Sequence, residues 1–198
     1  MSIDDVDTSK RRFLTIAATS VVGAVGAGFV AVPFISYWQP SAKARAAGAP
    51  VEVDISKLED GQRVIVEWRG KPVWIVRRTQ EMLSDLASLG GQLRDPESNV
   101  TDQQPKYAKN EHRSIKPEYL VVVGICTHLG CSPTYYSKHE PHPLGAEWKG
   151  GFFCPCHGSK FDLSGRVYQS VPAPTNLVVP PYTYLSDTRV LVGVDPKA

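Results

Sequence analysis

The sequence predicts a mostly β head of antiparallel strands, carried by one N-terminal transmembrane α-helix. Between Arg12 and Lys43 no charged residue occurs, so one uninterrupted segment has the composition of a membrane span. The rest of the chain contains short runs rich in valine, isoleucine and aromatic residues, which are typical of strands. Lys and Arg number 22 against 20 for Asp and Glu, and this net charge of +2 argues against a nucleic-acid partner.

Residues 13–38 form the expected membrane anchor. Crossing a bilayer as a helix takes about 20 predominantly apolar residues, and this stretch is longer. Tyr37 and Trp38 lie at its end, where interfacial aromatic side chains are expected. The alternative is a cleaved secretory signal, although the apolar stretch exceeds the usual core of such a signal.

The residues before the anchor, SKRRFL at 9–14, resemble the twin-arginine export signal, in which Ser or Thr precedes Arg-Arg-x-Phe-Leu. Aligned on the Phe-Leu pair, the arginine pair becomes Lys10 and Arg11. The resemblance implies that residues 1–12 stay in a bacterial cytoplasm. It also implies a single-pass inner-membrane protein whose head is exported already folded, with its cofactor, to the periplasmic side. An ordinary basic flank is the alternative.

Residues 39–50 are expected to form a flexible tether, because they are small, partly charged and rich in alanine, proline and glycine. Their alanine content also allows a helix, which would shorten the tether. The head then occupies residues 51–198.

The head is expected to begin with a strand and a hairpin, followed by a short helix at 79–89 that ends at two glycines. Residues 92–118 are polar and irregular. Strands are expected at residues 51–55, 63–68, 72–76, 119–125, about 147–153 and 189–194.

All four cysteines and two of the five histidines lie in two short segments, CTHLGC at 126–131 and CPCHGS at 154–159. Together they offer six potential metal ligands. A structural zinc ion needs four, while four thiolates or two disulfides would leave both histidines unused. One partition uses all six residues: two cysteines and two histidines bind a two-iron cluster, and the other two cysteines form a disulfide.

These segments resemble the two motifs of the Rieske proteins, which they match letter for letter. The resemblance implies an antiparallel Rieske head with one Rieske-type 2Fe-2S cluster in an inserted cluster-binding subdomain, at about residues 124–174. Cys126 and Cys154 would bind one iron as thiolates, and His128 and His157 would bind the other through ring nitrogens.

The resemblance also implies a disulfide between Cys131 and Cys156 that links the two loops. A disulfide needs an oxidising compartment, which agrees with export. Neutral imidazoles in place of anionic thiolates leave less negative charge around the irons. Potentials are then roughly −150 to +300 mV, against about −400 mV for plant-type ferredoxins.

Residues around the cluster follow the family with two departures. Ser159 is expected to hydrogen-bond a bridging sulfide, and VPAP at 171–174 resembles the proline loop that covers the cluster. Phe161 stands where many relatives have a tyrosine, and Val171 stands where glycine is common. His112, His139 and His142, outside the motifs, are expected at the surface.

The anchor, the tether and the segment 77–117, with its QLRDP motif at 92–96, resemble the Rieske subunits of ubiquinol:cytochrome c oxidoreductases. The resemblance implies a catalytic subunit of a respiratory-chain enzyme, within a dimeric complex with a cytochrome b subunit and a cytochrome c-type haem subunit. Ubiquinol would hydrogen-bond to His157, which accepts a proton as the cluster accepts an electron. Leu129 and Pro172 would dock on cytochrome b. The alternatives are a Rieske small subunit of an arsenite oxidase and a membrane-anchored electron carrier without quinone chemistry.

Overall fold

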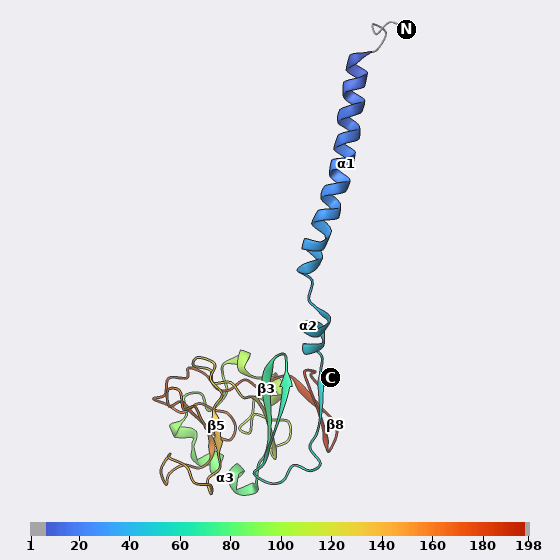
Figure 1. The fold of residues 1–198 in the computed structure, drawn as a ribbon. Helices are drawn as coiled ribbons and strands as arrows, with labels where there is room; N and C mark the ends of the chain where they lie inside the picture. The colour runs from blue at the N-terminus through green and yellow to red at the C-terminus, as the bar shows by residue number, and fades with distance from the viewer. Residues whose placement is uncertain (1–6, 197–198) are drawn as a thin grey trace. The chain divides into compact units, whose positions relative to one another are not determined.

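The computed structural model describes residues 7–196, which form two compact units divided at Ala46 and Ala47 (Figure 1). One unit is helical and the other is the β-rich head. Residues 1–6 of the expected cytoplasmic segment lie outside the described residues.

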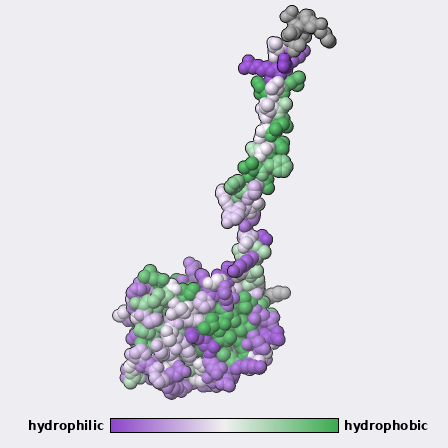
Figure 2. All heavy atoms as spheres, viewed as in Figure 1, coloured by the Kyte–Doolittle hydropathy of each residue, from purple (hydrophilic) through white to green (hydrophobic). Residues whose placement is uncertain are grey.

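The helical unit begins with α1, Thr8–Tyr37. Asp7 caps it, because its carboxylate accepts the backbone N–H groups of Ser9 and Lys10. No residue of the helix is buried, and it is long and apolar enough to span a membrane. Figure 2 shows hydrophobic residues along much of it, after hydrophilic residues near its start. This confirms the expected apolar helix, which begins at Thr8, five residues earlier than predicted.

Part of the expected tether is helical. The short helix α2 spans Ala42–Ala47, and the Ser41 hydroxyl accepts the N–H of Ala44 at its first turn. The alanine-rich part of the tether is therefore helical, which was one of the two expected conformations. The flexibility of the tether stays a prediction.

Two of the antiparallel sheets of the head supply most of its core. The first has the order β1-β9-β8, with β1 at Val51–Asp54, β9 at Arg189–Val192 and β8 at Tyr182–Ser186. The second has the order β2-β3-β4, with β2 at Arg63–Trp68, β3 at Lys71–Arg77 and β4 at Tyr119–Val123. Their apolar strands supply most of the core, since β3 and β4 are buried along most of their length.

A third sheet, β5-β6-β7, comes between β4 and β8 in the chain. Its strands are short: β5 is Thr134–Tyr136, β6 is Gly151–Phe153 and β7 is Lys160–Phe161. The predicted strand at about 147–153 is thus confined to its last three residues. Strands β5 and β7 were not predicted, because two or three residues carry too little periodicity. The five-residue strand β8 was not predicted either.

The helix α3, Gln80–Ser88, confirms the predicted helix, with Thr79 as its N-cap and Met82 and Leu86 buried. The following segment is irregular, as predicted. It contains single 3₁₀ turns at Gly90–Gln92, Thr101–Gln103 and Lys106–Ala108.

Candidate metal centre

Two loops with the same backbone hydrogen bonds build the candidate site. In the first, the Cys126 N–H donates to the Cys131 carbonyl at 2.8 Å, and the Gly130 N–H donates to the Cys126 carbonyl at 3.0 Å. In the second loop, the Cys154 N–H donates to the Ser159 carbonyl at 2.8 Å, and the Gly158 N–H donates to the Cys154 carbonyl at 2.9 Å. The first cysteine of each motif therefore occupies the same place in its loop.

The pattern depends on a glycine at the fifth position of each motif. Gly130 has φ 85° and Gly158 has φ 78°, the left-handed region that side chains disfavour. An added Cβ would meet nothing within 4 Å at either position. The requirement for glycine is therefore one of backbone conformation and not of space.

The two first cysteines are free and buried, with Cys126 and Cys154 each 2% exposed. Burial raises the pKa of the Cys126 thiol, while hydrogen bonds from the His128 backbone N–H and the Ser159 hydroxyl favour its thiolate. Cys154 also lies within hydrogen-bonding reach of Cys126. Two soft sulfur donors therefore lie side by side in a protected site.

The other two cysteines form a disulfide. Cys131 and Cys156 are joined across the two loops, with their Cα atoms 6.7 Å apart. This confirms the pairing that the resemblance implied. The Cys154 sulfur lies within 4.8 Å of both bridge sulfurs, but only Cys154 of the three can offer a thiolate.

The two imidazoles come together from opposite loops. The ring centroids of His128 and His157 are 4.8 Å apart and the rings are nearly perpendicular. His128 is half-buried and His157 is exposed. The donor set that remains outside the disulfide, two thiols and two imidazoles, fits a Rieske 2Fe-2S cluster, and in number it also fits a tetrahedral zinc ion.

The proline loop closes one side of this site. The Ala173 N–H donates to the buried Ser159 hydroxyl at 3.0 Å, and the Thr127 hydroxyl donates to the Thr175 carbonyl at 2.7 Å. Each cluster loop thus holds the proline loop through one side chain. Pro172 at its tip is exposed.

Leu129 is 72% exposed, which is unusual for a leucine in the head.

Position 171 does not require a glycine. The residue with the left-handed backbone is Ser170, one position earlier, with φ 57°.

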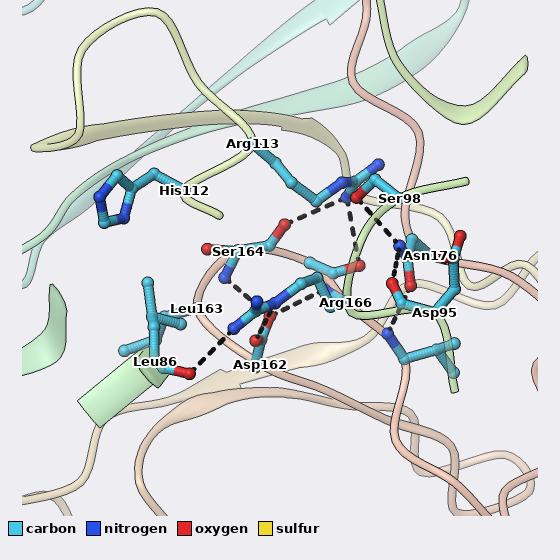
Figure 3. A network of polar contacts seen from close by, with 12 residues as sticks. Leu86, Asp95, Ser98, His112, Arg113, Asp162, Leu163, Ser164, Arg166 and Asn176 are labelled. Carbon is cyan, nitrogen blue, oxygen red and sulfur yellow. Dashed lines mark hydrogen bonds and ion pairs between the residues drawn. The ribbon is translucent and has the colours of Figure 1, made fainter. Parts of the chain in front are cut away.

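A network of buried arginines supports the turn after β7, and the sequence analysis missed it (Figure 3). Arg166 pairs with Asp162 at 2.7 Å and also donates to the Leu86 carbonyl at the end of α3. Arg78 and Arg113 are buried and donate to several carbonyls, among them Leu163 and Ser164 respectively.

Burial lowers the pKa of both Arg78 and Arg113 to about 10, with Asp162 acting in the opposite direction, so both stay charged at neutral pH. Neither residue has a local sequence signal, because its partners come from segments far away in the chain.

The remaining histidines are only partly as predicted. His139 is exposed, whereas His112 and His142 are half-buried. Burial and the nearby Arg78 lower the pKa of His112.

Comparison with known proteins gives two family matches. Residues 1–41 match a family described as "Ubiquitinol-cytochrome C reductase Fe-S subunit TAT signal", and residues 50–183 match the family "Rieske [2Fe-2S] domain". The first match confirms the resemblance of residues 9–14 to the twin-arginine signal.

Curated relatives cover nearly the whole chain. The ubiquinol-cytochrome c reductase iron-sulfur subunit of Allochromatium vinosum is 63% identical over 195 residues, 98% of this chain and 93% of that protein. The subunit of the same name from Blastochloris viridis is 45% identical over 193 residues, 97% of each chain. Among solved structures, a chain of "Hyperthermophilic respiratory Complex III" is similar with a TM-score of 0.48 and 26% identity, over 89% of this chain and 97% of that one.

Proposed function

Because the chain belongs to the Rieske [2Fe-2S] family, among its ubiquinol-cytochrome c reductase iron-sulfur subunits, we propose how its own residues hold the cluster and serve quinol oxidation. Because the chain belongs to this family, its cofactor is a Rieske 2Fe-2S cluster and not a zinc ion. The chain is thus a membrane-anchored electron-transfer subunit of a cytochrome bc1-type quinol oxidoreductase, with cytochrome b and c1 subunits as partners.

Cys126 and Cys154 would hold one iron through their buried thiolates, and His128 and His157 would hold the second through one ring nitrogen each. The observation that supports this assignment is the donor set outside the disulfide: two free, buried cysteines, and two histidine rings of the same two loops whose centroids are 4.8 Å apart. When bound, the cluster supplies a one-electron acceptor of high potential, because imidazole adds no negative charge.

His157 is the residue that meets the quinol. It is exposed while His128 is half-buried, so its ring nitrogen that does not bind iron is accessible to a quinol. When this nitrogen is deprotonated, it accepts a hydrogen bond from a quinol hydroxyl. His157 would take the hydroxyl proton of the quinol at this nitrogen, and the electron would go to the cluster that the four residues hold. The quinol is ubiquinol, bound by cytochrome b.

Leu129 and Pro172 form the apolar contact with cytochrome b. Both are exposed and both belong to loops that the Ser159 and Thr127 hydrogen bonds hold around the site. After reduction the head moves on its tether to the c-type haem subunit. The complex is dimeric, with its anchor in the bacterial inner membrane and the head on the periplasmic side.

Electron paramagnetic resonance of the reduced cluster in native membranes tests this function. A quinol-site inhibitor should shift the spectrum, because it replaces quinol against His157. An unchanged spectrum would contradict quinol oxidation and favour an arsenite oxidase subunit or an electron carrier.

A matched pair of variants tests the docking contact. Leu129→Ala should weaken the inhibitor-induced shift, because it removes apolar surface that meets cytochrome b. Ile65→Ala, which shortens an exposed side chain on β2, should leave the shift as in the wild type. Equal shifts in the wild type and both variants would show that Leu129 does not belong to the docking surface.

A further inference from the structure

The QLRDP motif, residues 92–96, lies against the chain just before the proline loop. Leu93 bridges Tyr168 in antiparallel fashion. The Arg94 N–H donates to the Val167 carbonyl at 2.9 Å, and the Gln169 N–H donates to the Gln92 carbonyl at 2.8 Å. The motif and residues 167–169 therefore form a short two-stranded ribbon.

The same motif also holds the chain just after the proline loop. The buried Asn176 donates from its amide nitrogen to the Asp95 carbonyl at 3.0 Å (Figure 3). Its amide oxygen accepts the Val167 N–H at 2.8 Å, which ties the two ends of the loop to each other. Both ends of the proline loop are thus fixed to residues 92–96.

Arg94 alone in this motif extends a side chain to the loop itself, among the hydrogen bonds of the described residues. Its guanidinium Nη2 donates to the Val171 carbonyl at 2.9 Å. Val171 follows Ser170, whose left-handed backbone is unfavourable for a residue with a side chain. Such a conformation persists only where neighbouring contacts hold it, and the Arg94 contact is next to it.

A continuous path of contacts leads from Arg94 to the cluster site. Val171 is two residues from Ala173, whose N–H donates to the hydroxyl of Ser159 in the second cluster loop. Pro172 lies between the two contact points. A shift of Val171 would therefore move both the exposed tip and the contact that closes the loop over the site.

We propose that Arg94 is a positioning residue of the quinol-oxidising site, which sets the proline loop through the Val171 carbonyl, with residues 92–96 as its support. The proposal rests on the proposed function in one respect, namely that the loop docks on the quinol-binding partner. The side chain of Arg94 is exposed, so it can be changed without opening the core.

The primary test is hydrogen exchange by mass spectrometry on the full-length holoprotein in detergent. Arg94→Met should accelerate exchange of the amides of Val171, Ala173 and Thr175, and of Ala173 above all. About threefold to tenfold is expected, the factor that one net hydrogen bond provides. Arg94→Lys keeps a donor and should restore part of the protection. Arg189→Met removes an exposed arginine of β9 and should leave these amides as in the wild type.

Unchanged exchange in Arg94→Met, or no restoration by Arg94→Lys, would overturn the proposal. An equal acceleration in β3 and β4 would also overturn it, because the whole head would then have loosened. The thermal midpoints of the variants should match that of the wild type.

A second readout separates this inference from the proposed function. In membranes, Arg94→Met should raise the apparent KM for ubiquinol severalfold, with the cluster spectrum retained. A wild-type spectrum insensitive to a quinol-site inhibitor would defeat the proposed function, and the exchange result would still decide whether Arg94 positions the loop. An unchanged KM beside a sensitive wild-type spectrum would defeat the role of Arg94 in the reaction.

Discussion

Phe161 lies fully buried one residue before the Asp162 turn, paired with Phe152 across β6 and β7. It belongs to the same core cluster as Cys126 and Cys154. At this scale each side chain near the cluster contributes either a bond to iron, a hydrogen bond to a ligand, or shielding from water. Phe161 contributes shielding, and a tyrosine there would add a hydrogen-bond donor.

Phe161→Tyr should raise the cluster potential. A hydroxyl directed at a ligand sulfur stabilises the reduced, more negative cluster more than the oxidised one. A hydrogen bond to a charged group is worth about 1.5–3 kcal/mol, of which only part differs between redox states. The expected rise is on the order of tens of millivolts, since about 59 mV is a tenfold change for one electron. A redox titration followed by electron paramagnetic resonance measures it. An unchanged or lower potential would show that Phe161 acts by packing alone.

Replacing any of Cys126, His128, Cys154 or His157 by Ala should abolish the cluster. Each change removes one bond to iron, and the nearest other sulfurs are committed to the Cys131–Cys156 disulfide. The visible absorbance and the paramagnetic signal of the membranes measure the loss. His139→Ala, at an exposed position outside both loops, is the control and should keep both signals. A native spectrum in any of the four variants would refute the ligand assignment.

At the scale of elements, α3 is tied to the loop after β5. Lys138 binds Glu81 at 2.7 Å and Asp85 at 2.9 Å, one turn apart on the helix. Hydrogen bonds from Lys138, and then from His139, lower the pKa of Glu81 to about 2 from 4.5. Since Arg166 holds the other end of α3, the helix links this loop to the turn after β7.

The ion pair between Lys138 and Glu81 should weaken in acid. A carboxyl whose pKa is lowered by folding stabilises the protein above its unfolded value of 4.5, and the contribution is lost as the pH falls towards 2. Glu81→Gln should therefore lower the thermal midpoint at pH 6, and the difference from the wild type should shrink between pH 4.5 and 2. Glu67→Gln, at an exposed carboxyl on β2, is the control. A difference that does not depend on pH would contradict the charge-based explanation.

The tether is the second element whose behaviour can be tested. Proline substitutions at Ala44 and Ala46 would break α2 and fix the backbone, since proline restricts φ and cannot donate a hydrogen bond. If the head moves between two partners, ubiquinol oxidation should slow severalfold while the cluster spectrum stays native. Steady-state turnover in membranes measures the effect. Undiminished turnover would indicate a stationary head.

At the scale of the whole molecule, export signal and anchor belong to one helix. The basic residues Lys10, Arg11 and Arg12 lie in the first turns of α1, directly before its apolar stretch. A folded head with an inserted cluster suits an export route that carries folded proteins, because the ligands come from loops far apart in the chain.

Arg11→Gln should reduce export without changing the apolar length of the helix. Protease accessibility of the head in spheroplasts measures the outcome: the variant should stay protected inside. Arg45→Gln, after the apolar stretch, is the matched control and should be exported normally. Normal export of Arg11→Gln would show that the basic residues act only as an ordinary membrane flank.

Local features of this protein could be predicted from its sequence. Apolar length predicted α1, short runs rich in valine, isoleucine and aromatic residues predicted β1 to β4 and β9, and helical spacing predicted α3, because each depends on residues close together in the chain. The two cysteine and histidine motifs identified the donors of the metal centre for the same reason, since each loop is complete within six residues.

The tertiary structure decided what depends on distant partners. One disulfide among four cysteines can join any of six pairs. The resemblance implied Cys131 with Cys156, and the approach of the two loops joins this pair. The buried arginines, the left-handed Ser170 and the contact of Arg94 with Val171 are likewise set by segments that are far apart in sequence. The physical reason is that hydrogen bonds and burial act through space, so a lone charged residue gives no local sign of the carbonyls it will meet.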